Sequence, residues 1–228
     1  ALEDLGIECL SPLKDKDSLV GIVLLATKDK GRRYSYEDLN FLASVNSISS
    51  IAVKNSRLYE RAYLEARTDE LTGLLNRNAM FELIASTLEG LGHKGRHSLF
   101  MIDLDNFKAI NDNFGHVFGD AVLREVADGI RSVFRPTDAL ARIGGDEFLV
   151  FLENVDKPDV LARKAGEVVS TLHKSYIGPG QNFPLSCSVG ISVYPDDGRT
   201  VIDLFKSADA AMYASKQHGK DRYSFRET

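Results

Sequence analysis

The pattern of apolar positions changes twice along the chain and divides it into three segments. Residues 1 to about 36 are typical of short strands with turns, since the apolar, β-branched run 18–27 (SLVGIVLLAT) is followed by the polar turn 28–33 (KDKGRR). A helical period then extends over residues 35–70 without Pro or Gly, beginning at Ser35 with acidic residues in its first turn. A helix of this length is too long for a small core, which indicates a connector.

From about residue 68 the chain alternates between helical and strand periods. Helices are predicted at 78–91, 107–114, 120–134, 157–173 and 202–217, and strands at 98–104, 139–143, 147–152, 185–193 and 222–225. Gly144 and Gly145 lie between two of these strands, and consecutive glycines supply the pair of positive φ angles that a tight hairpin turn needs. Helices and strands in mixed order, with a hairpin among them, predict an α+β domain.

Composition and charge narrow the functional classes. The chain has 228 residues, 43% of them hydrophobic, and a net charge of −5, so a nucleic-acid partner is not expected. Cys9 and Cys187 fit no metal-binding spacing, which favours a reduced, cytoplasmic compartment. No apolar run reaches the roughly 20 residues that span a bilayer, so no membrane segment is expected in this chain. It opens at Ala1 without Met, which indicates a piece of a longer protein whose missing N-terminal part could be membrane-attached.

Four acids stand where predicted strands end or turn. Asp103 and Asp105 close an apolar strand, and Asp146 and Glu147 follow the glycine pair. Strand interiors disfavour unpaired carboxylates, whereas strand ends let them converge on a hard cation such as Mg²⁺. Two such ions can activate an attacking hydroxyl and stabilise the leaving group in nucleotidyl transfer. Each acid alone is also explained as a turn residue or helix cap, most simply Asp105.

Residues 142–148 read RIGGDEF, and the stretch 68–228 resembles the GGDEF diguanylate cyclases. The resemblance is carried also by 69–77 (DELTGLLNR), 103–112 (DLDNFKAIND), 115–120 (GHVFGD), 187–197 (CSVGISVYPDD) and 209–220 (DAAMYASKQHGK). It implies an α+β fold with a central, mostly antiparallel sheet wrapped by helices, similar to nucleotidyl cyclases and polymerase palms. It also implies a homodimeric enzyme, a diguanylate cyclase, that condenses two GTP into cyclic di-GMP and two pyrophosphates. The implied cofactor is Mg²⁺, or Mn²⁺, with two ions per active site.

The resemblance assigns chemical roles to individual positions. The implied metal contacts are Asp103, the backbone carbonyl of Leu104, Asp146 and Glu147. Asp146 is implied to deprotonate the attacking 3′-hydroxyl, with Glu147 beside it. Lys108 is implied to stabilise the charge that develops during transfer.

Substrate binding is implied at a second set of positions: Asn111, His116, Asp120, Gly144, Gly145, Lys216 and Lys220. The carboxylate of Asp120 can accept from the guanine N1–H and N2 amine, which adenine lacks, and this gives a reason for GTP over ATP. His116 is equally well explained as a structural contact before a helix. The commoner family residue at position 220 is Arg, and Lys220 lacks the fork through which arginine binds a phosphate with two hydrogen bonds. Ser215 and Asp221 also depart from the usual Ala and Asn, without removing a group that the reaction requires.

Residues 135–138 (RPTD) match the RxxD inhibitory site of the family. The match implies that cyclic di-GMP binds Arg135 and Asp138 as an inhibitor, with Arg142 as a second contact. An arginine fork can bind a phosphate or a guanine edge through two hydrogen bonds. The alternative is a solvated turn that holds a local ion pair.

Residues 1–55 resemble the C-terminal part of a GAF sensory domain, in the stretches 19–26 (LVGIVLLA), 36–42 (YEDLNFL) and 51–58 (IAVKNSRL). The connector at 35–70 overlaps this part and carries a heptad-like series: Val45, Ile48, Ala52, Asn55, Tyr59, Ala62 and Ala66. The series predicts a dimer seam in which Asn55 fixes the register. The alternative is a stripe that packs on its own domain.

Two other functions compete with an active enzyme. One is a catalytically dead receptor for GTP or cyclic di-GMP, and the other is a purely structural signalling dimer.

Overall fold

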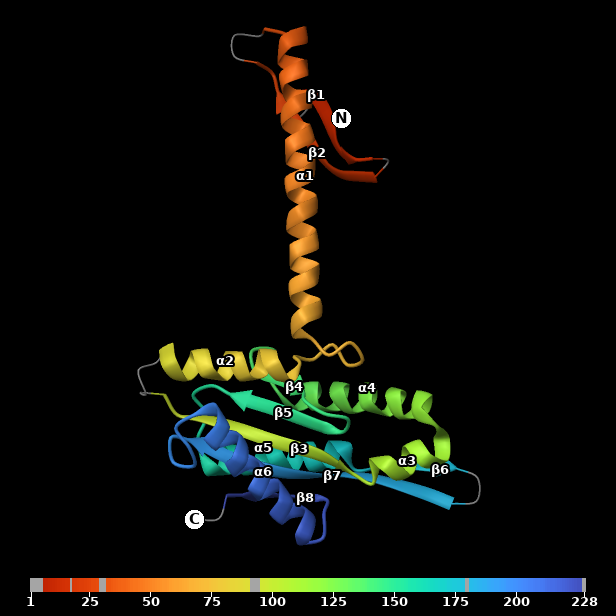
Figure 1. Ribbon diagram of the computed structural model, residues 1–228, viewed down its shortest axis with the longest axis vertical. Helices are drawn as coiled ribbons and strands as arrows, with labels where there is room; N and C mark the ends of the chain where they lie inside the picture. The colour runs from red at the N-terminus through yellow and green to blue at the C-terminus, as the bar shows by residue number, and fades with distance from the viewer. Residues whose placement is uncertain (1–5, 17, 29–31, 91–94, 179–180, 227–228) are drawn as a thin grey trace. The chain divides into compact units, whose positions relative to one another are not determined.

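The computed structural model describes residues 6–16, 18–28, 32–90, 95–178 and 181–226 (Figure 1). These residues form two compact units, Ala1–Ala66 and Arg67–Thr228, which we describe separately as the N-terminal and the C-terminal unit. Two parts of predicted elements, residues 29–31 of the polar turn and Leu91 of a predicted helix, lie outside the described residues. Within the described ranges, no helix has both the length and the hydropathy that crossing a membrane requires.

The N-terminal unit consists of a hairpin and a long helix. Strands β1 (Ile7–Asp15) and β2 (Ser18–Ala26) pair antiparallel, and α1 (Tyr36–Arg67) follows. The hydroxyl of Ser35 accepts from the N–H of Asp38 at 3.3 Å, while the carboxylate of Asp38 accepts from the N–H of Ser35 at 2.7 Å. This reciprocal cap satisfies two free backbone donors and fixes the start of the helix where the sequence predicts it.

One side of α1 contacts the hairpin and another carries the heptad series. Asn46 and Ser50 are buried, and the amide of Asn46 donates to the hydroxyl of Ser11 in β1 at 2.5 Å. In the heptad series, by contrast, Ile48 is 70% exposed and Tyr59 is 75% exposed. The stripe therefore does not pack on the hairpin of its own unit.

The C-terminal unit is built on one sheet with strand order β4-β5-β3-β7-β6, in which all these neighbours pair antiparallel. The strands are β3 (His97–Asp105), β4 (Ala139–Arg142), β5 (Glu147–Leu152), β6 (Lys174–Gly178), β7 (Gln181–Tyr194) and β8 (Arg222–Phe225), the last pairing parallel with β7. The helices are α2 (Arg77–Gly90), α3 (Phe107–Phe114), α4 (His116–Val133), α5 (Pro158–Leu172) and α6 (Val201–Gln217). The predicted α+β fold with a mostly antiparallel sheet is confirmed.

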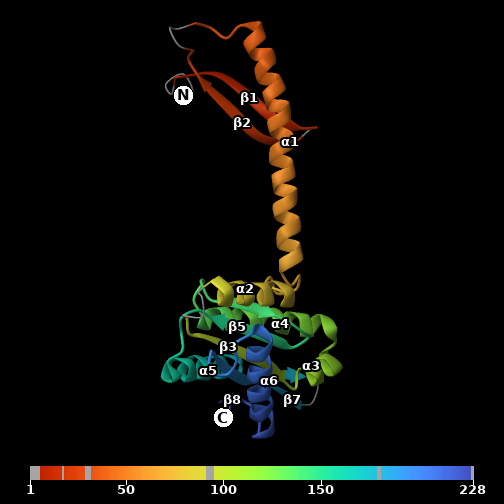
Figure 2. The same cartoon turned by 60° about the vertical axis from the view of Figure 1, so that its left-hand side comes forward.

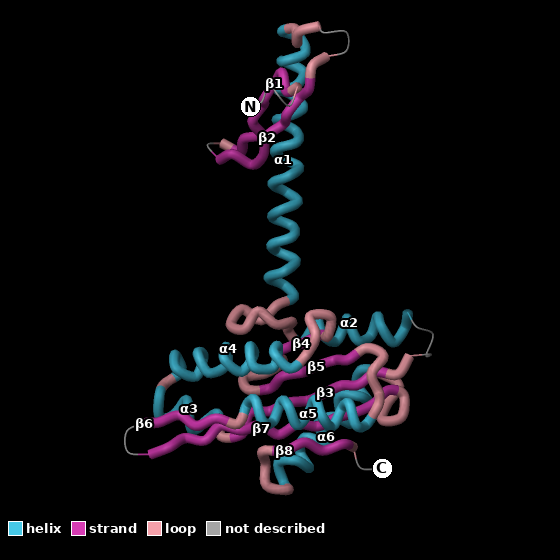
Figure 3. Tube along the Cα trace, turned by 180° about the vertical axis from the view of Figure 1, so that it is seen from behind, coloured by secondary structure: helices cyan, strands magenta, loops and turns pink. Residues whose placement is uncertain are grey.

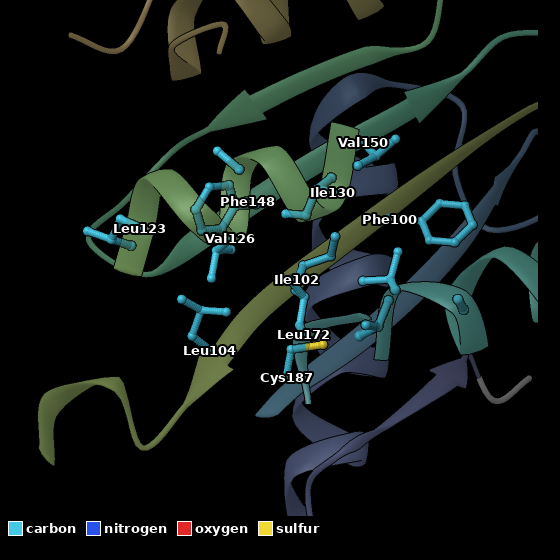
Figure 4. Close-up of a cluster of buried hydrophobic side chains, with 14 of the residues drawn as sticks. Phe100, Ile102, Leu104, Leu123, Val126, Ile130, Phe148, Val150, Leu172 and Cys187 are labelled. Atoms are coloured by element: carbon cyan, nitrogen blue, oxygen red, sulfur yellow. The ribbon is translucent and has the colours of Figure 1, made fainter. Parts of the chain in front are cut away.

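Helices cover both faces of this sheet. Alternate strand residues point to opposite faces, so each face buries its own apolar set. Figure 3 shows α4 and α5 on the near face, and Figures 1 and 2 show α6 on the other. The first face buries the cluster in Figure 4, which includes Phe100, Ile102, Leu104, Leu123, Val126, Ile130, Phe148, Val150, Leu172 and Cys187. The second face packs against α2 and α6 through Met80, Ile84, Leu99, Met101, Leu149, Phe151, Leu204 and Met212.

In the C-terminal unit, three differences from the sequence-based prediction are larger than one residue at the end of an element. Strand β6 was not predicted, and β7 is longer than the predicted 185–193, because the ends of this hairpin carry polar residues and Pro184. Helix α4 begins at His116 rather than Asp120. Gly115 adopts a φ of 82°, which reverses the chain directly from α3 into α4 without an intervening loop. The predicted guanine motif therefore lies largely within a helix.

Candidate active site at the end of the central strand

The acids predicted from the sequence meet at the end of β3. Asp103 is the direct neighbour of Glu147 across the β3–β5 pairing. The backbone N–H of Leu104 donates to the carbonyl oxygen of Asp146 at 3.2 Å. Sheet register thus brings together all four positions predicted as metal contacts, although they come from two separate stretches of chain.

The charges in this cluster are close enough to affect one another. Burial raises the pKa of the Asp103 carboxyl, the ammonium of Lys216 at 2.8 Å from Oδ1 opposes that rise, and the charge of Asp146 adds to it. Burial also raises the pKa of Glu147, and the charges of Asp103, Asp146 and Asp209 raise it further. Repulsion of this kind is relieved by a bound cation.

The donor set fits a hard divalent ion. In the described part of the chain, no three carboxylate, imidazole or thiol groups lie close enough together to hold a metal on their own. A magnesium ion needs no such set, because one or two carboxylates, water and substrate phosphates complete its coordination. The acids at this strand end supply only oxygen ligands, as Mg²⁺ prefers. The residues present therefore fit an ion that binds together with a nucleotide.

The two glycines between β4 and β5 have a structural role different from the one predicted. Positive φ angles were expected at Gly144 and Gly145, but neither adopts a φ between +20° and +160°. A Cβ on Gly144 would instead lie 2.5 Å from Oε2 of Glu147, so this glycine leaves room for the carboxylate. A Cβ on Gly145 would meet no atom within 4 Å, and its carbonyl accepts from Arg142 at 2.9 and 3.2 Å.

Lysines from two elements surround the acid cluster. Lys216, in the last turn of α6, is bonded to Asp103. The ammonium of Lys220 donates to Oδ1 of Asn106, at the start of α3, at 3.1 Å. Lys108 is exposed in the first turn of the same helix. The three lysines predicted to contact phosphates therefore all lie at or beside the end of β3.

The predicted guanine contacts lie on α3 and α4. Asn111 is half-buried in α3, and Asp120 is exposed in α4. A Cβ on Gly119 would lie 1.9 Å from Oδ1 of Asn111, so the Asn111 side chain occupies space that only glycine leaves free. His116 is not a residue before the helix, as expected, but the exposed first residue of α4.

Asp105 is not the cap of α3, and its carboxylate is held by donors of the protein itself. The N-cap residue of α3 is Asn106, whose side chain makes no capping hydrogen bond. The Asp105 carboxylate is 2% exposed and accepts from the hydroxyls of Ser186 and Ser188, both at 2.9 Å. It also accepts from the N–H of Asp221 at 3.2 Å.

The RPTD stretch forms a turn beside an open pocket of about 490 Å³. The carboxylate of Asp138 accepts from the N–H of Arg135 at 2.9 Å, so in the described residues this turn is closed by a side chain bonded to the backbone and not by an ion pair. Arg131 lines the same pocket, which sequence reasoning missed. Arg142 does not line it: its side chain, 14% exposed, pairs with Asp69 at 3.2 Å.

Comparison with known proteins identifies the family of the C-terminal unit. Residues 66–222 match the family described as "Diguanylate cyclase, GGDEF domain". The chain is 35% identical over 216 residues to Diguanylate cyclase A of Treponema denticola, covering 92% of this chain and 57% of the relative. It is 39% identical over 168 residues to the cyclic di-GMP phosphodiesterase PdeR of Escherichia coli, covering 73% of this chain and 25% of the relative. The chain thus spans between a quarter and just over half of these relatives.

Solved structures show the same architecture. The coiled coil and GGDEF domain of DgcB from Caulobacter crescentus, in complex with c-di-GMP, has a TM-score of 0.70 and 29% identity, covering 81% of this chain and 98% of that one. A sensory box/GGDEF family protein from Caulobacter crescentus CB15 has a TM-score of 0.60 and 39% identity, covering 67% of this chain and 99% of that one. The family match spans most of this chain and includes every acid and lysine described at the end of β3. The chain therefore belongs to the GGDEF domain family of diguanylate cyclases.

Proposed function

We propose that the C-terminal unit condenses two GTP molecules into cyclic di-GMP and releases two pyrophosphates. The observation that carries this proposal is the pairing of Asp103 with Glu147 across β3 and β5, with the cation of Lys216 at the same strand end. The names of the relatives support it, since one is called a diguanylate cyclase and one solved GGDEF domain is in complex with c-di-GMP.

The chemistry follows from the groups present. In each of two steps, the 3′-oxygen of one GTP bonds to the α-phosphorus of the other, and the bond from that phosphorus to the β-phosphate oxygen breaks. The carboxylate of Asp146 takes the hydroxyl proton, and pyrophosphate leaves with the electron pair. Lys108 and Lys216 offset the charge that builds up on the phosphates. Asp103, Asp146, Glu147 and the Leu104 carbonyl would hold two ions of magnesium or manganese per active site. When bound, these ions would supply Lewis-acid polarisation of the phosphoryl group.

Selection of guanine is assigned to α3 and α4. The Asp120 carboxylate accepts from the N1–H and N2 amine of guanine, and the Asn111 amide can both accept from the guanine edge and donate to it. His116 lies at the start of α4, the helix that carries Asp120. Gly144 and Gly145 are assigned to the same nucleotide site: Gly145 leaves open space for the nucleotide beside the backbone, whereas the space beside Gly144 is taken by the carboxylate of Glu147. Lys220 binds the triphosphate as a point charge, since lysine lacks the fork of arginine.

Formation of a cyclic dinucleotide requires two such domains, because one guanine pocket cannot present both partners. We assign residues 68–228 to the catalytic domain, 35–70 to a connector, and 1–55 to the C-terminal part of a GAF-like sensory domain in the cytoplasm. The exposed stripe of α1, including Ile48 and Tyr59, is the proposed seam of the homodimer. Inserting four residues after Asn55 shifts the heptad phase and is expected to change the rate while each catalytic domain stays folded. An unchanged rate would contradict this role of the connector.

Product inhibition belongs to the same proposal. Cyclic di-GMP is assigned to Arg135 and Asp138, beside the open pocket. Arg142 is proposed as a second contact, and it would have to leave its pair with Asp69 to make that contact.

A second candidate function is a domain that binds GTP or cyclic di-GMP without turnover. One observation favours it: the Escherichia coli relative of 39% identity is named a cyclic di-GMP phosphodiesterase. Incubation of the purified 228-residue chain with GTP and Mg²⁺, followed by chromatography of the products, separates the two candidates. Cyclic di-GMP supports the cyclase, whereas nucleotide binding without any product supports the receptor.

A further inference from the structure

Asp105 is a buried carboxylate that the chemistry described above does not use. Its Oδ1 accepts from the hydroxyl of Ser188, and its Oδ2 accepts from the hydroxyl of Ser186 and the N–H of Asp221. Both oxygens are thus occupied by protein donors, and in the described residues no basic side chain pairs with this carboxylate. Burying an ionised group is costly unless hydrogen bonds compensate for lost water, so three converging donors indicate a specific structural task.

The donor from Asp221 shows what that task is. Gly219, Lys220 and Asp221 form the turn between α6 and β8, with φ angles of 109°, 65° and 50°. Left-handed backbone at two consecutive residues other than glycine is uncommon and persists only where surrounding contacts hold it. Asp105 holds this turn through the Asp221 N–H, and the imidazole of His173 holds the Asp221 carboxylate from the other side at 2.8 Å.

Two parallel contacts join this turn to the end of β3. Asp105 accepts from Asp221, and the next residue, Asn106, accepts from the ammonium of Lys220 at 3.1 Å. Asn106 itself is left-handed, with a φ of 63°, so both sides of the junction have unusual backbone. The orientation of the Lys220 side chain toward the active site therefore depends on a bond made by its neighbour to Asp105.

We infer that Asp105 is a positioning residue that holds the turn of residues 219–221, and through it Lys220, in place to bind the triphosphate of GTP. The inference rests on the function proposed above. It separates the two acids of the β3 end: Asp103 faces the nucleotide, whereas Asp105 organises the protein around it. It also explains why β7 has serines two positions apart, since Ser186 and Ser188 both donate their hydroxyls to the Asp105 carboxylate.

The experiment measures binding of the α,β-methylene analogue of GTP, which cannot release pyrophosphate, to the full chain in Mg²⁺. Asp105→Asn keeps the size of the side chain but replaces one acceptor oxygen by a donor. We expect Asp105→Asn and Lys220→Ala each to weaken binding on the order of tenfold, as for the loss of one charge-assisted contact. The double variant should bind no more weakly than Lys220→Ala alone, because Asp105 acts through Lys220. Independent effects that multiply in the double variant would overturn the inference.

Variants of two serines on β7 test the inference without changing Asp105 or Lys220, in case Asp105→Asn fails to fold. Ser188→Ala removes one donor to Asp105, while Ser192→Ala, on the same strand, removes a buried hydroxyl that donates to the carbonyl of Leu204 instead. We expect weaker analogue binding in Ser188→Ala and unchanged binding in Ser192→Ala, and equal effects of both would contradict the inference. If wild type turns over GTP, Asp105→Asn should have a higher KM than wild type, with little change in kcat and no change in the Mg²⁺ dependence. A shifted Mg²⁺ dependence would make Asp105 a metal ligand, whereas analogue binding without wild-type turnover would refute only the proposed function.

Discussion

The ammonium of Lys216 lies 2.8 Å from the carboxylate of Asp103 and joins the last turn of α6 to the end of β3. The helix can lie directly on the sheet because β7 has a glycine beneath it: a Cβ on Gly190 would lie 2.0 Å from the carbonyl oxygen of Ala208. This backbone contact fixes the height at which Lys216 reaches the strand end. A cation from the C-terminal helix thereby offsets the repulsion within the acid cluster.

Replacement of this cation should affect nucleotide and metal in opposite directions. In Lys216→Met, GTP binding should weaken roughly tenfold because the triphosphate loses a charged donor. Binding of Mn²⁺ without nucleotide should strengthen, because Asp103 loses the cation that competes with the metal. Calorimetric titrations measure both affinities, with Lys206→Met, exposed on the same helix, as the control that changes neither. Weaker binding of both ligands would contradict the proposed competition.

Gly119→Ala should impair recognition of GTP without touching it. The added Cβ would lie 1.9 Å from Oδ1 of Asn111, so that side chain has to move. We expect KM for GTP to rise about tenfold, the size of one lost hydrogen bond to a well-fitted site. Gly166→Ala, in α5 where a Cβ meets nothing within 4 Å, should leave KM unchanged and stabilise the fold by up to about 1 kcal/mol. An unaltered KM in Gly119→Ala would remove Asn111 from the guanine contacts.

Inhibition by product should depend on an exposed arginine. In Arg135→Ala, added cyclic di-GMP should no longer slow the enzyme, since the fork that binds phosphate or guanine is gone. Initial rates over a series of cyclic di-GMP concentrations test this. Arg163→Ala, an exposed arginine of α5 in an i,i+4 pair, provides the control with inhibition intact. Equal inhibition of Arg135→Ala and wild type would exclude the RPTD turn as the site.

The Asp69–Arg142 pair should make the C-terminal unit sensitive to acid. Burial opposes the shift, but hydrogen bonds from Thr72 and from Arg142 together hold the pKa of Asp69 below its ordinary value of 3.8. A depressed pKa contributes stability above pH 3.8, and this contribution is lost as the pH falls through the lower, folded-state value. In Asp69→Asn, the free energy of unfolding should be lower at neutral pH and should fall less steeply below pH 3.8. Parallel acid limbs for variant and wild type would show that Asp69 titrates as in the unfolded chain.

Local pattern was sufficient for most of the elements, though not for β6, and for the stretches that carry the acid cluster. The apolar run 98–104 predicted β3, and the glycine pair of GGDEF predicted a turn between β4 and β5. Sheet register then placed Asp103 beside Glu147, which the sequence order of two predicted strands does not specify. The roles of these residues stay predictions until they are tested in solution.

Long-range partners were beyond the reach of sequence pattern. Asp105 was predicted to join the acid cluster, with a helix cap as the alternative, yet its three donors come from residues more than 80 positions away. The glycine pair was read through turn geometry, whereas Gly144 is small because the carboxylate of Glu147 folds against it. Arg131 lines the pocket only four residues before Arg135, and it was missed because the RPTD match does not include it.

Synthesis of cyclic di-GMP at the end of β3 is tested most directly by the products of Asp103→Asn and wild type with GTP and Mg²⁺. Wild type should release two pyrophosphates for each cyclic di-GMP. Asp103→Asn should form product at least about 100-fold more slowly, because loss of a metal-binding carboxylate removes several kcal/mol of transition-state stabilisation. Its thermal unfolding midpoint should stay close to that of wild type, since the amide keeps the size of the side chain and removes a charge that burial and the neighbouring acids disfavour. Wild-type rates in the variant, or pyrophosphate without cyclic di-GMP in either protein, would contradict this site and its proposed reaction.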